Sequence, residues 1–247
     1  MIYIGIVNVK NLKAEKTALF RLPQNIAEII DKTGNEKEKK LRTGAYLLLK
    51  SMYFEHYFKK SENRDAGCEK LPNISFSECG KPYFEGLKTP IFNISHSGEF
   101  AVVAMSDKVE AVGVDIQCEP KLKSSLENAS KRFFAPFKKC DTGVYCAQNS
   151  PDFEEELAVT FYSPKSSDED GTVLIKENTY PSFSFLPDKE SFDDKLVIWT
   201  LLEAALKMHG DGFGAYSGAE KIISDSKTKS ADFKYGGKRY AFSISYK

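Results

Sequence analysis

The sequence is poor in the residues that most often bind transition metals in proteins. Only three histidines and five cysteines occur among 247 residues, and no two cysteines have the Cys-x-x-Cys spacing. A zinc site or a histidine-rich metal centre needs clusters of these residues, so neither is expected. The odd number of cysteines also argues against a disulfide framework, and we expect reduced thiols in a cytoplasmic protein.

An excess of charge of one sign and long apolar runs are also lacking. The 35 basic and 35 acidic side chains cancel to a formal net charge of +0. Overall attraction to nucleic acid or to an anionic membrane is therefore not expected, and any phosphate must be recognised locally. No run approaches the roughly 20 apolar residues of a spanning helix, and no basic segment precedes the apolar start of the chain.

Two segments of the chain are similar in pattern. Residues 3–7 (YIGIV) and 111–115 (AVGVD) both favour strands that have a glycine at the same place. Each segment is followed by a predicted amphipathic helix, at 41–58 and at 199–208, and then by two paired strands. These strand pairs are predicted at 92–94 with 100–105 and at 233–235 with 240–246. The order predicts an α+β fold of two similar, pseudo-twofold halves, 1–108 and 109–247.

The second half contains an insertion of about 50 residues, which we place at about 137–195. Two strand-like runs within it, 157–162 and 172–175, flank a polar stretch and predict a hairpin. A surface elaboration and a partner-binding element both fit this pattern. The charged stretch 31–40 predicts a turn-rich connector.

Polar residues gather at 93–98, where the sequence reads NISHSG. The hydroxyl of Ser95, the imidazole of His96 and nearby backbone amides are phosphate-binding groups, and Gly98 permits a tight turn. A hairpin turn with a hydrogen-bonded histidine explains the same residues.

Two further candidates are acidic. Asp115 ends an apolar strand-like run, and Gln117 lies on the same strand face, so the two could offer oxygen ligands to a hard divalent cation. A carboxylate that caps a turn is the alternative for Asp115. On the later helix, Glu203 and Lys207 share a face and could act together on a phosphate, although a surface ion pair explains the same spacing.

Four motifs, taken in this order, resemble those of the 4′-phosphopantetheinyl transferases of the surfactin-synthetase-activating (Sfp) type. They are Gly80-Lys81-Pro82-Tyr83-Phe84, Phe92-Asn93-Ile94-Ser95-His96-Ser97-Gly98, Val112-Gly113-Val114-Asp115-Ile116-Gln117 and Trp199-Thr200-x-x-Glu203-Ala204-x-x-Lys207. Arg42-Thr43 and Arg132-Phe133-Phe134 also resemble family positions. The resemblance implies a monomer with two similar halves and an active site between them.

The resemblance also implies a reaction, in which the phosphopantetheine arm of coenzyme A is transferred to a serine of an acyl or peptidyl carrier protein. By this resemblance, Asp115, Gln117 and Glu203 would hold Mg²⁺, while Glu203 would act as the base and Lys207 would stabilise the leaving phosphate. The resemblance further assigns His96 and Arg42 to the 3′-phosphate of coenzyme A, and Lys81 and Ser95 to its other phosphates.

The sequence departs from the family pattern at two of these positions. Gln117 stands where the family often has glutamate, and Leu202 stands where it usually has lysine. Both departures remove charge, so a non-catalytic relative that binds coenzyme A or a carrier protein is the main alternative. An α+β protein in which all the motif residues are structural is a third.

Overall fold

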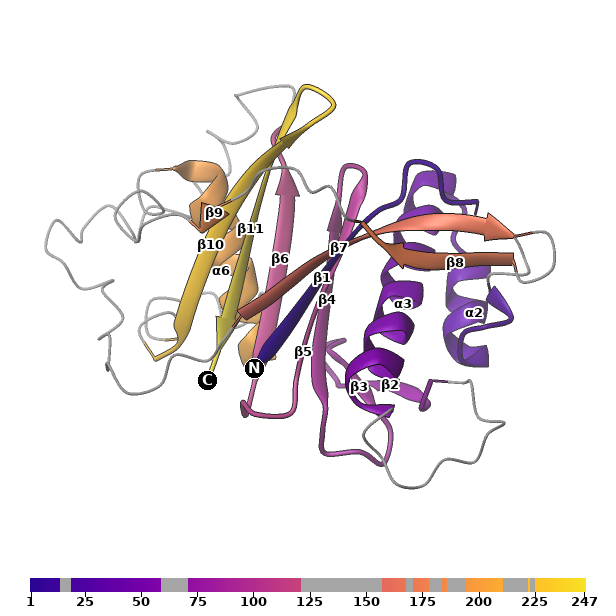
Figure 1. Cartoon of the computed structure of the whole chain (residues 1–247). Coiled ribbons are helices and arrows are strands. Elements are labelled where there is room, and N and C mark those ends of the chain that lie inside the picture. The colour runs from indigo at the N-terminus through magenta and orange to yellow at the C-terminus, as the bar shows by residue number, and fades with distance from the viewer. Residues whose placement is uncertain are drawn as a thin grey trace, which may run out of the picture. The chain divides into compact units, whose positions relative to one another are not determined.

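The computed structural model describes residues 1–13, 19–58, 71–120, 157–167, 171–177, 184–185, 194–210, 222 and 225–247. The chain divides into two compact units. Unit 1 comprises residues 1–108 and 156–180, and unit 2 comprises residues 109–155 and 181–247. Both units combine helices with sheets of mainly antiparallel strands (Figure 1), as the α+β prediction requires.

Unit 1 is built on a five-stranded sheet. Its strands are β1 (Ile2–Asn8), β4 (Ile91–Ser97), β5 (Phe100–Ser106), β7 (Leu157–Ser167) and β8 (Gly171–Lys176). They lie in the order β4-β5-β1-β7-β8, and β1 is antiparallel to β5 and parallel to β7. A small separate sheet pairs β2 (Ile74–Phe76) with β3 (Pro82–Phe84).

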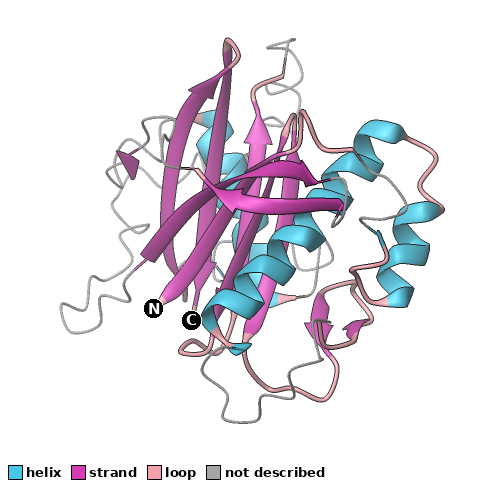
Figure 2. Ribbon diagram, turned by 45° about the vertical axis from the view of Figure 1, so that its right-hand side comes forward, coloured by secondary structure: helices cyan, strands magenta, loops and turns pink. Residues whose placement is uncertain are grey.

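The helices of unit 1 are α2 (Gln24–Asp31) and α3 (Glu36–His56). Helix α3 packs against β1, β4 and β5 and lies across the sheet (Figure 2). A Cβ atom at Gly5 of β1 would overlap the side chain of Met52 and crowd that of Leu48, so this glycine lets the helix approach the strand closely. The main apolar core of the unit lies between α3 and the sheet.

The predicted connector at 31–40 is wrong, because residues 36–40 form the first turns of α3. Asn35 begins the helix: its side chain accepts a hydrogen bond from the backbone N–H of Glu38. Glu36 and Glu38 also place negative charge in the first turn, where the helix dipole favours it. The charged composition therefore reflects a solvated helix start rather than a loop.

Unit 2 contains a four-stranded sheet and helix α6 (Lys195–His209). The strands are β6 (Val112–Cys118), β9 (Ser184–Phe185), β10 (Lys227–Tyr235) and β11 (Lys238–Tyr246), in the order β6-β11-β10-β9. Helix α6 packs on β6, β11 and β10. It begins at Asp194, whose side chain accepts hydrogen bonds from the N–H groups of Leu196 and Val197, and it ends at Gly210, which has φ of 96°.

The predicted strand, helix and hairpin occur in the same order in both units. The hairpins are β4 with β5 in unit 1 and β10 with β11 in unit 2. The first strand of each unit pairs with the second strand of its hairpin, so the strand orders β4-β5-β1 and β10-β11-β6 correspond. This agreement is internal to each unit, and a pseudo-twofold relation between the units stays a prediction.

The predicted hairpin inside the insertion is present as β7 and β8, but it belongs to unit 1. Strand β7 extends the sheet by pairing with β1 from Ile2↔Leu157 to Val7↔Tyr162. The Glu55 carboxylate on α3 also accepts hydrogen bonds from Tyr162 and Lys176. The sequence placed this segment in the second half, because a pairing between positions about 155 residues apart leaves no local pattern.

None of the helices in the described part of the chain is both long enough and apolar enough to cross a membrane.

Candidate functional site

The acidic candidates of unit 2 lie where α6 comes closest to β6. A Cβ atom at Gly113 would overlap the backbone carbonyl of Ala204 and the backbone nitrogen of Met208, so any larger residue would push the helix away. Side chains two residues apart share a strand face, and Gly113, Asp115 and Gln117 therefore all lie toward α6. The glycine thus brings the polar end of β6 within reach of the helix.

Asp115 and Lys207 form the centre of this group. The Asp115 carboxylate is only 1% exposed, and its Oδ1 atom lies 2.6 Å from the Lys207 Nζ atom. Its Oδ2 atom accepts a hydrogen bond of 3.1 Å from the Gln117 amide. A buried carboxylate is costly without partners, and here two side chains supply them.

Glu203 lies beside the same pair. Its Oε2 atom is 3.9 Å from the Lys207 Nζ atom, one helical turn away, and its side chain is 15% exposed. The pKa of the Glu203 carboxyl is raised to about 7, mainly by burial and then by the nearby Asp115 charge, against the opposing effects of Lys207 and a hydrogen bond from Trp199. Glu203 therefore takes up and releases a proton near neutral pH.

These side chains surround a position suited to a cation. The Lys207 ammonium group already lies near both carboxylates, at 2.6 Å from Asp115 and 3.9 Å from Glu203. Two carboxylates and the Gln117 amide oxygen are the oxygen ligands that Mg²⁺ prefers, and Mg²⁺ often binds through only one or two carboxylates. Among the described residues no three His, Cys, Asp or Glu side chains form a metal-binding group, so the remaining ligands would be the amide, water or substrate.

A chain of buried hydroxyl groups fixes α6 on its sheet. The Ser243 Oγ atom on β11 lies 2.6 Å from Thr200 Oγ1 on α6 and 2.8 Å from Ser230 Oγ on β10. All three residues are buried. Thr200 is one turn before Glu203, and Ser243 is opposite Asp115 in the strand register. These hydrogen bonds therefore fix the orientation of α6 about its own axis, in which Glu203 and Lys207 are directed toward β6.

In unit 1, Arg42 and His96 meet at one carboxylate oxygen. The Glu38 Oε1 atom accepts a hydrogen bond of 2.8 Å from Arg42 Nε and lies 3.5 Å from His96 Nε2. Arg42 and Glu38 are one turn apart on α3, whereas His96 is on β4. The two residues predicted to bind one phosphate are therefore neighbours, and both face an acidic side chain that the sequence reasoning missed.

Lys81 and Ser95 have different surroundings. Lys81 follows a tight turn in which its backbone N–H donates to Ser77 Oγ, and burial lowers the pKa of its ammonium group. Ser95 is buried on β4. It lies next to His96 in the strand, so the two side chains point to opposite faces of the sheet. The structure thus brings Arg42 and His96 together but separates Ser95 from them.

The comparisons with known proteins relate one part of the chain to a known enzyme. No family model matches the chain. A curated 4′-phosphopantetheinyl transferase from Bacillus subtilis is 36% identical over 96 residues, which is 38% of this chain and 39% of that protein. Over this segment the chain is similar to a 4′-phosphopantetheinyl transferase. The chain therefore spans about two fifths of the length of that transferase.

The structure adds to the sequence analysis at Asp115 and Leu202. Asp115 does not end its strand or cap a turn: it lies in the middle of β6 and is buried. Leu202, where the family usually has lysine, packs in an apolar cluster with Leu206 and Ile222. The leucine therefore contributes to helix packing, and its side chain lies among apolar neighbours. Residues 132–134 lie outside the described residues.

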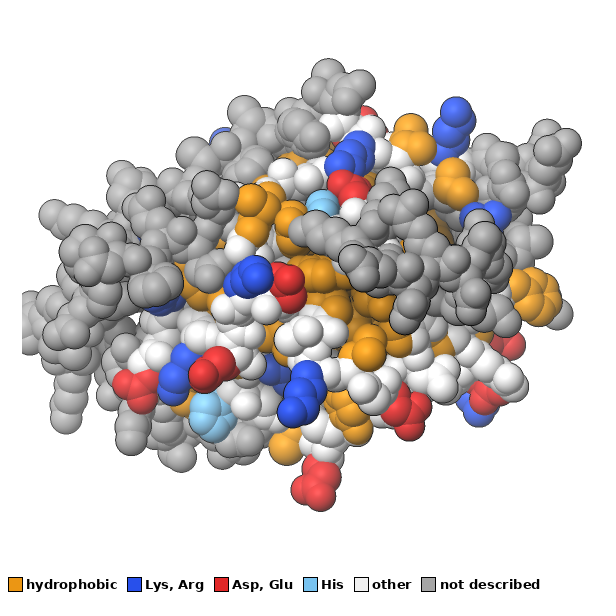
Figure 3. All heavy atoms as spheres, turned by 60° about the horizontal axis from the view of Figure 1, so that its bottom comes forward, with side chains coloured by type: hydrophobic (Ala, Val, Ile, Leu, Met, Phe, Trp, Pro, Cys, Tyr) orange, Lys and Arg blue, Asp and Glu red, His pale blue; other side chains and the backbone are white. Residues whose placement is uncertain are grey.

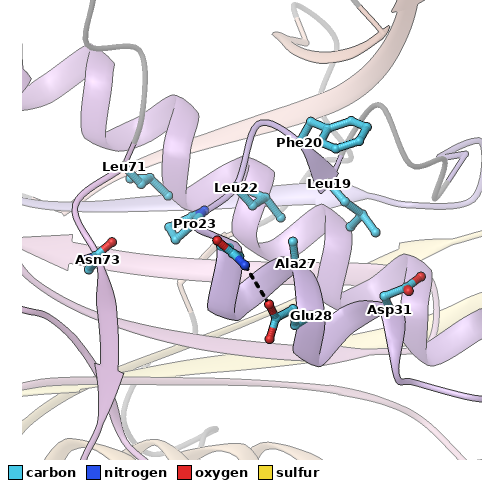
Figure 4. Close-up of a pocket in the computed structure, with 10 residues that line it drawn as sticks. Leu19, Phe20, Leu22, Pro23, Ala27, Glu28, Asp31, Leu71 and Asn73 are labelled. Atoms are coloured by element: carbon cyan, nitrogen blue, oxygen red, sulfur yellow. Dashed lines mark hydrogen bonds between the residues drawn. The ribbon is translucent and has the colours of Figure 1, made fainter.

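A cavity of about 640 Å³ in unit 1 lies beside α2 and is lined by none of the predicted site residues (Figure 4). Its lining is largely apolar, and its charged members, Glu28 and Asp31, are acidic. Glu28 accepts a hydrogen bond of 3.0 Å from Gln24. An anionic cofactor would be repelled there, so this cavity is not a candidate for coenzyme A phosphates.

The described surface also lacks a broad basic patch on the face shown in Figure 3, where blue and red side chains alternate. This mixed distribution agrees with the formal net charge of +0. A phosphate ligand on this face would therefore have to be bound by individual cationic side chains and not by a broad basic surface.

Proposed function

We propose that the chain is a Mg²⁺-dependent 4′-phosphopantetheinyl transferase of the Sfp type. It would transfer the phosphopantetheine arm of coenzyme A to a serine of an acyl or peptidyl carrier protein in the cytoplasm, and it would act as a monomer. The similarity to a named transferase supports the reaction class. The observation that supports the chemistry is the Lys207 ammonium group near two carboxylates, one of which has a pKa of about 7.

Glu203 has the properties that the proposed general base needs. In the reaction the serine hydroxyl oxygen attacks the phosphorus that bears the pantetheine group, and the bond to the 3′-phosphoadenylate oxygen breaks. The serine proton must leave during this step, and a carboxylate with a pKa near the working pH accepts it efficiently. Burial and the neighbouring Asp115 give Glu203 such a pKa.

Lys207 and the oxygen ligands would act on the charge of the reacting phosphates. Lys207 would stabilise the departing phosphate oxygen of adenosine 3′,5′-bisphosphate by a charge-assisted hydrogen bond. Asp115, Glu203 and Gln117 would hold Mg²⁺, which when bound neutralises charge on the pyrophosphate. Because Asp115 now binds Lys207, loading the metal would require Lys207 to turn away from that carboxylate.

The residues of unit 1 would recognise the nucleotide end of the substrate. Arg42 and His96 would bind the 3′-phosphate, since they already share one anionic oxygen. Lys81 would bind another phosphate, because a partly buried ammonium group gains from a nearby anion. Ser95 would bind a phosphate other than the one held by His96, since the two side chains lie on opposite sheet faces.

The proposal is tested by the mass of a carrier protein. The chain is incubated with coenzyme A, Mg²⁺ and each member of a panel of apo acyl and peptidyl carrier proteins, and the carriers are weighed by mass spectrometry. We expect a gain equal to one phosphopantetheine group on at least one carrier, and loss of this gain with Glu203→Gln. An unmodified panel would refute the proposed activity.

A non-catalytic relative that binds coenzyme A is the second candidate. It is favoured by Gln117, which places an amide rather than a third carboxylate beside Asp115. Calorimetry distinguishes the two functions. Coenzyme A binding that does not depend on Mg²⁺, together with no transfer, would favour the binding protein.

A further inference from the structure

The contact between Glu38, Arg42 and His96 has a consequence for how an anion enters unit 1. Glu38 Oε1 is the acceptor of the Arg42 Nε hydrogen bond and is also the atom nearest to His96 Nε2, at 2.8 and 3.5 Å. A phosphate oxygen that bound both Arg42 and His96 would need the same position. Two anionic oxygens cannot occupy it together.

We propose that Glu38 is a displaceable counter-ion, which occupies the 3′-phosphate subsite in the ligand-free protein and leaves it when the phosphate binds. This inference rests on the proposed function, because it takes Arg42 and His96 as the residues that bind the 3′-phosphate. Glu38 is then a specificity-determining residue that weakens binding of the 3′-phosphate in substrate and product.

The partial exposure of the three side chains permits this exchange. The side chains of Arg42, Glu38 and His96 are 40%, 32% and 28% exposed. Glu38 can therefore rotate into solvent without opening the apolar core, which lies below α3. Ion pairs at this exposure are weak, so displacing the carboxylate costs little.

The charges decide which ligands displace the carboxylate. A phosphate monoester carries nearly two negative charges at neutral pH, whereas the Glu38 carboxylate carries one. The more highly charged group binds the same cations more strongly and replaces the weaker one. A nucleotide with a free 3′-hydroxyl has no charge to offer at this position, so it leaves the Glu38 contacts in place.

The same competition acts on the product. Adenosine 3′,5′-bisphosphate keeps its 3′-phosphate after transfer, and the returning Glu38 carboxylate would favour its release. Removing the carboxylate should therefore tighten the binding of this product. It should not tighten the binding of adenosine 5′-monophosphate, which lacks the 3′-phosphate.

The test is calorimetric titration of the full chain with these two nucleotides, at constant ionic strength in a phosphate-free buffer. The variant is Glu38→Gln, which keeps the size of the side chain and removes its charge. The matched control is Glu36→Gln, which removes the same charge from the same turn of α3 at an exposed position. Thermal melting of both variants checks that the fold is kept.

We expect Glu38→Gln to bind adenosine 3′,5′-bisphosphate about three- to tenfold more tightly than the wild-type chain, because the charged carboxylate that pairs with Arg42 and occupies the subsite is removed. Binding of adenosine 5′-monophosphate should stay within about twofold, and Glu36→Gln should stay within about twofold for both nucleotides. Unchanged or weaker bisphosphate binding by Glu38→Gln would overturn the inference alone. Equal affinity of the wild-type chain for both nucleotides would overturn the assigned phosphate site, and the inference with it.

Discussion

The pKa of Glu203 predicts that the chain loses stability as the pH rises through neutrality in the absence of metal. The folded state raises this pKa from 4.5 to about 7, so between these values the folded chain binds a proton that the unfolded chain has lost. The unfolded state then binds fewer protons, and the free energy of unfolding falls with increasing pH. The stabilising contribution is fully present below about pH 4.5 and is lost as the pH passes 7.

The expected loss follows from the size of the pKa change. One pKa unit corresponds to about 1.4 kcal/mol, so the wild-type chain should lose about 2 to 3 kcal/mol between about pH 5 and pH 8 from this group. The Glu203 side chain is 15% exposed, so solvent screening removes little of this. The Glu203→Gln variant has a neutral side chain of similar size at all these pH values and should not show the loss.

The measurement is urea unfolding of both proteins with EDTA at a series of pH values. The chain has a single tryptophan, Trp199, which lies on α6 and hydrogen-bonds Glu203, so its fluorescence reports on this unit. Other groups titrate in both proteins and cancel in the difference between them. Parallel stability profiles for the two proteins would refute the reasoning.

Adding Mg²⁺ extends the same experiment to the metal. A cation that binds the ionised Glu203 carboxylate stabilises only the folded state and should restore stability to the wild-type chain at pH 8. The Glu203→Gln variant lacks one of the two carboxylates and should gain much less. An equal gain in both proteins would place the cation elsewhere.

Two further predictions concern how α6 is held. Gly113→Ala should lower the free energy of unfolding by more than about 3 kcal/mol and reduce transfer, because its Cβ would overlap the backbone of α6. Urea unfolding measures the first effect and the carrier mass assay the second. A variant as stable as the wild-type chain would contradict the close packing. Ser243→Ala should cost about 1 to 3 kcal/mol, because its two buried hydroxyl partners lose a hydrogen bond. The matched control is Ser245→Ala on the same strand face, because the buried Ser245 hydroxyl has no hydrogen-bond partner within the described residues. Its removal should cost less than about 1 kcal/mol. Equal losses of stability in the two variants would contradict the hydroxyl chain.

Local patterns predicted the elements that depend on neighbouring residues. The apolar strands around Gly5 and Gly113 and the two hairpins have sequence signals of this kind. The helix predicted at 199–208 is also present, but α6 begins four residues earlier, at Lys195. The structure also supplies a reason for the repeated glycine, since in both units a helix crosses the strand there. The sequence pattern predicted both the glycines and the helices, but not that each helix crosses its strand at the glycine.

Contacts between distant segments could not be predicted in the same way. Asp115 was interpreted as a strand end because a charge interrupted an apolar run, and the Lys207 that neutralises it lies 92 positions away. Burial of a charge inside a strand depends on such a partner, which local sequence does not reveal. Glu38 did have a local signal, because its spacing to Arg42 is that of a helical ion pair. That signal was lost when residues 31–40 were interpreted as a connector.

The pairing of β1 with β7 also governs the order in which the chain can fold during synthesis. Strand β1 leaves the ribosome before β7, so its partner on one side is complete only after residue 162 has been made. Until then the β1 backbone lacks that partner and could pair with another chain. Completion of the first unit must therefore wait until the start of the second has been synthesised, and a fragment ending at residue 108 should aggregate rather than fold as an independent domain.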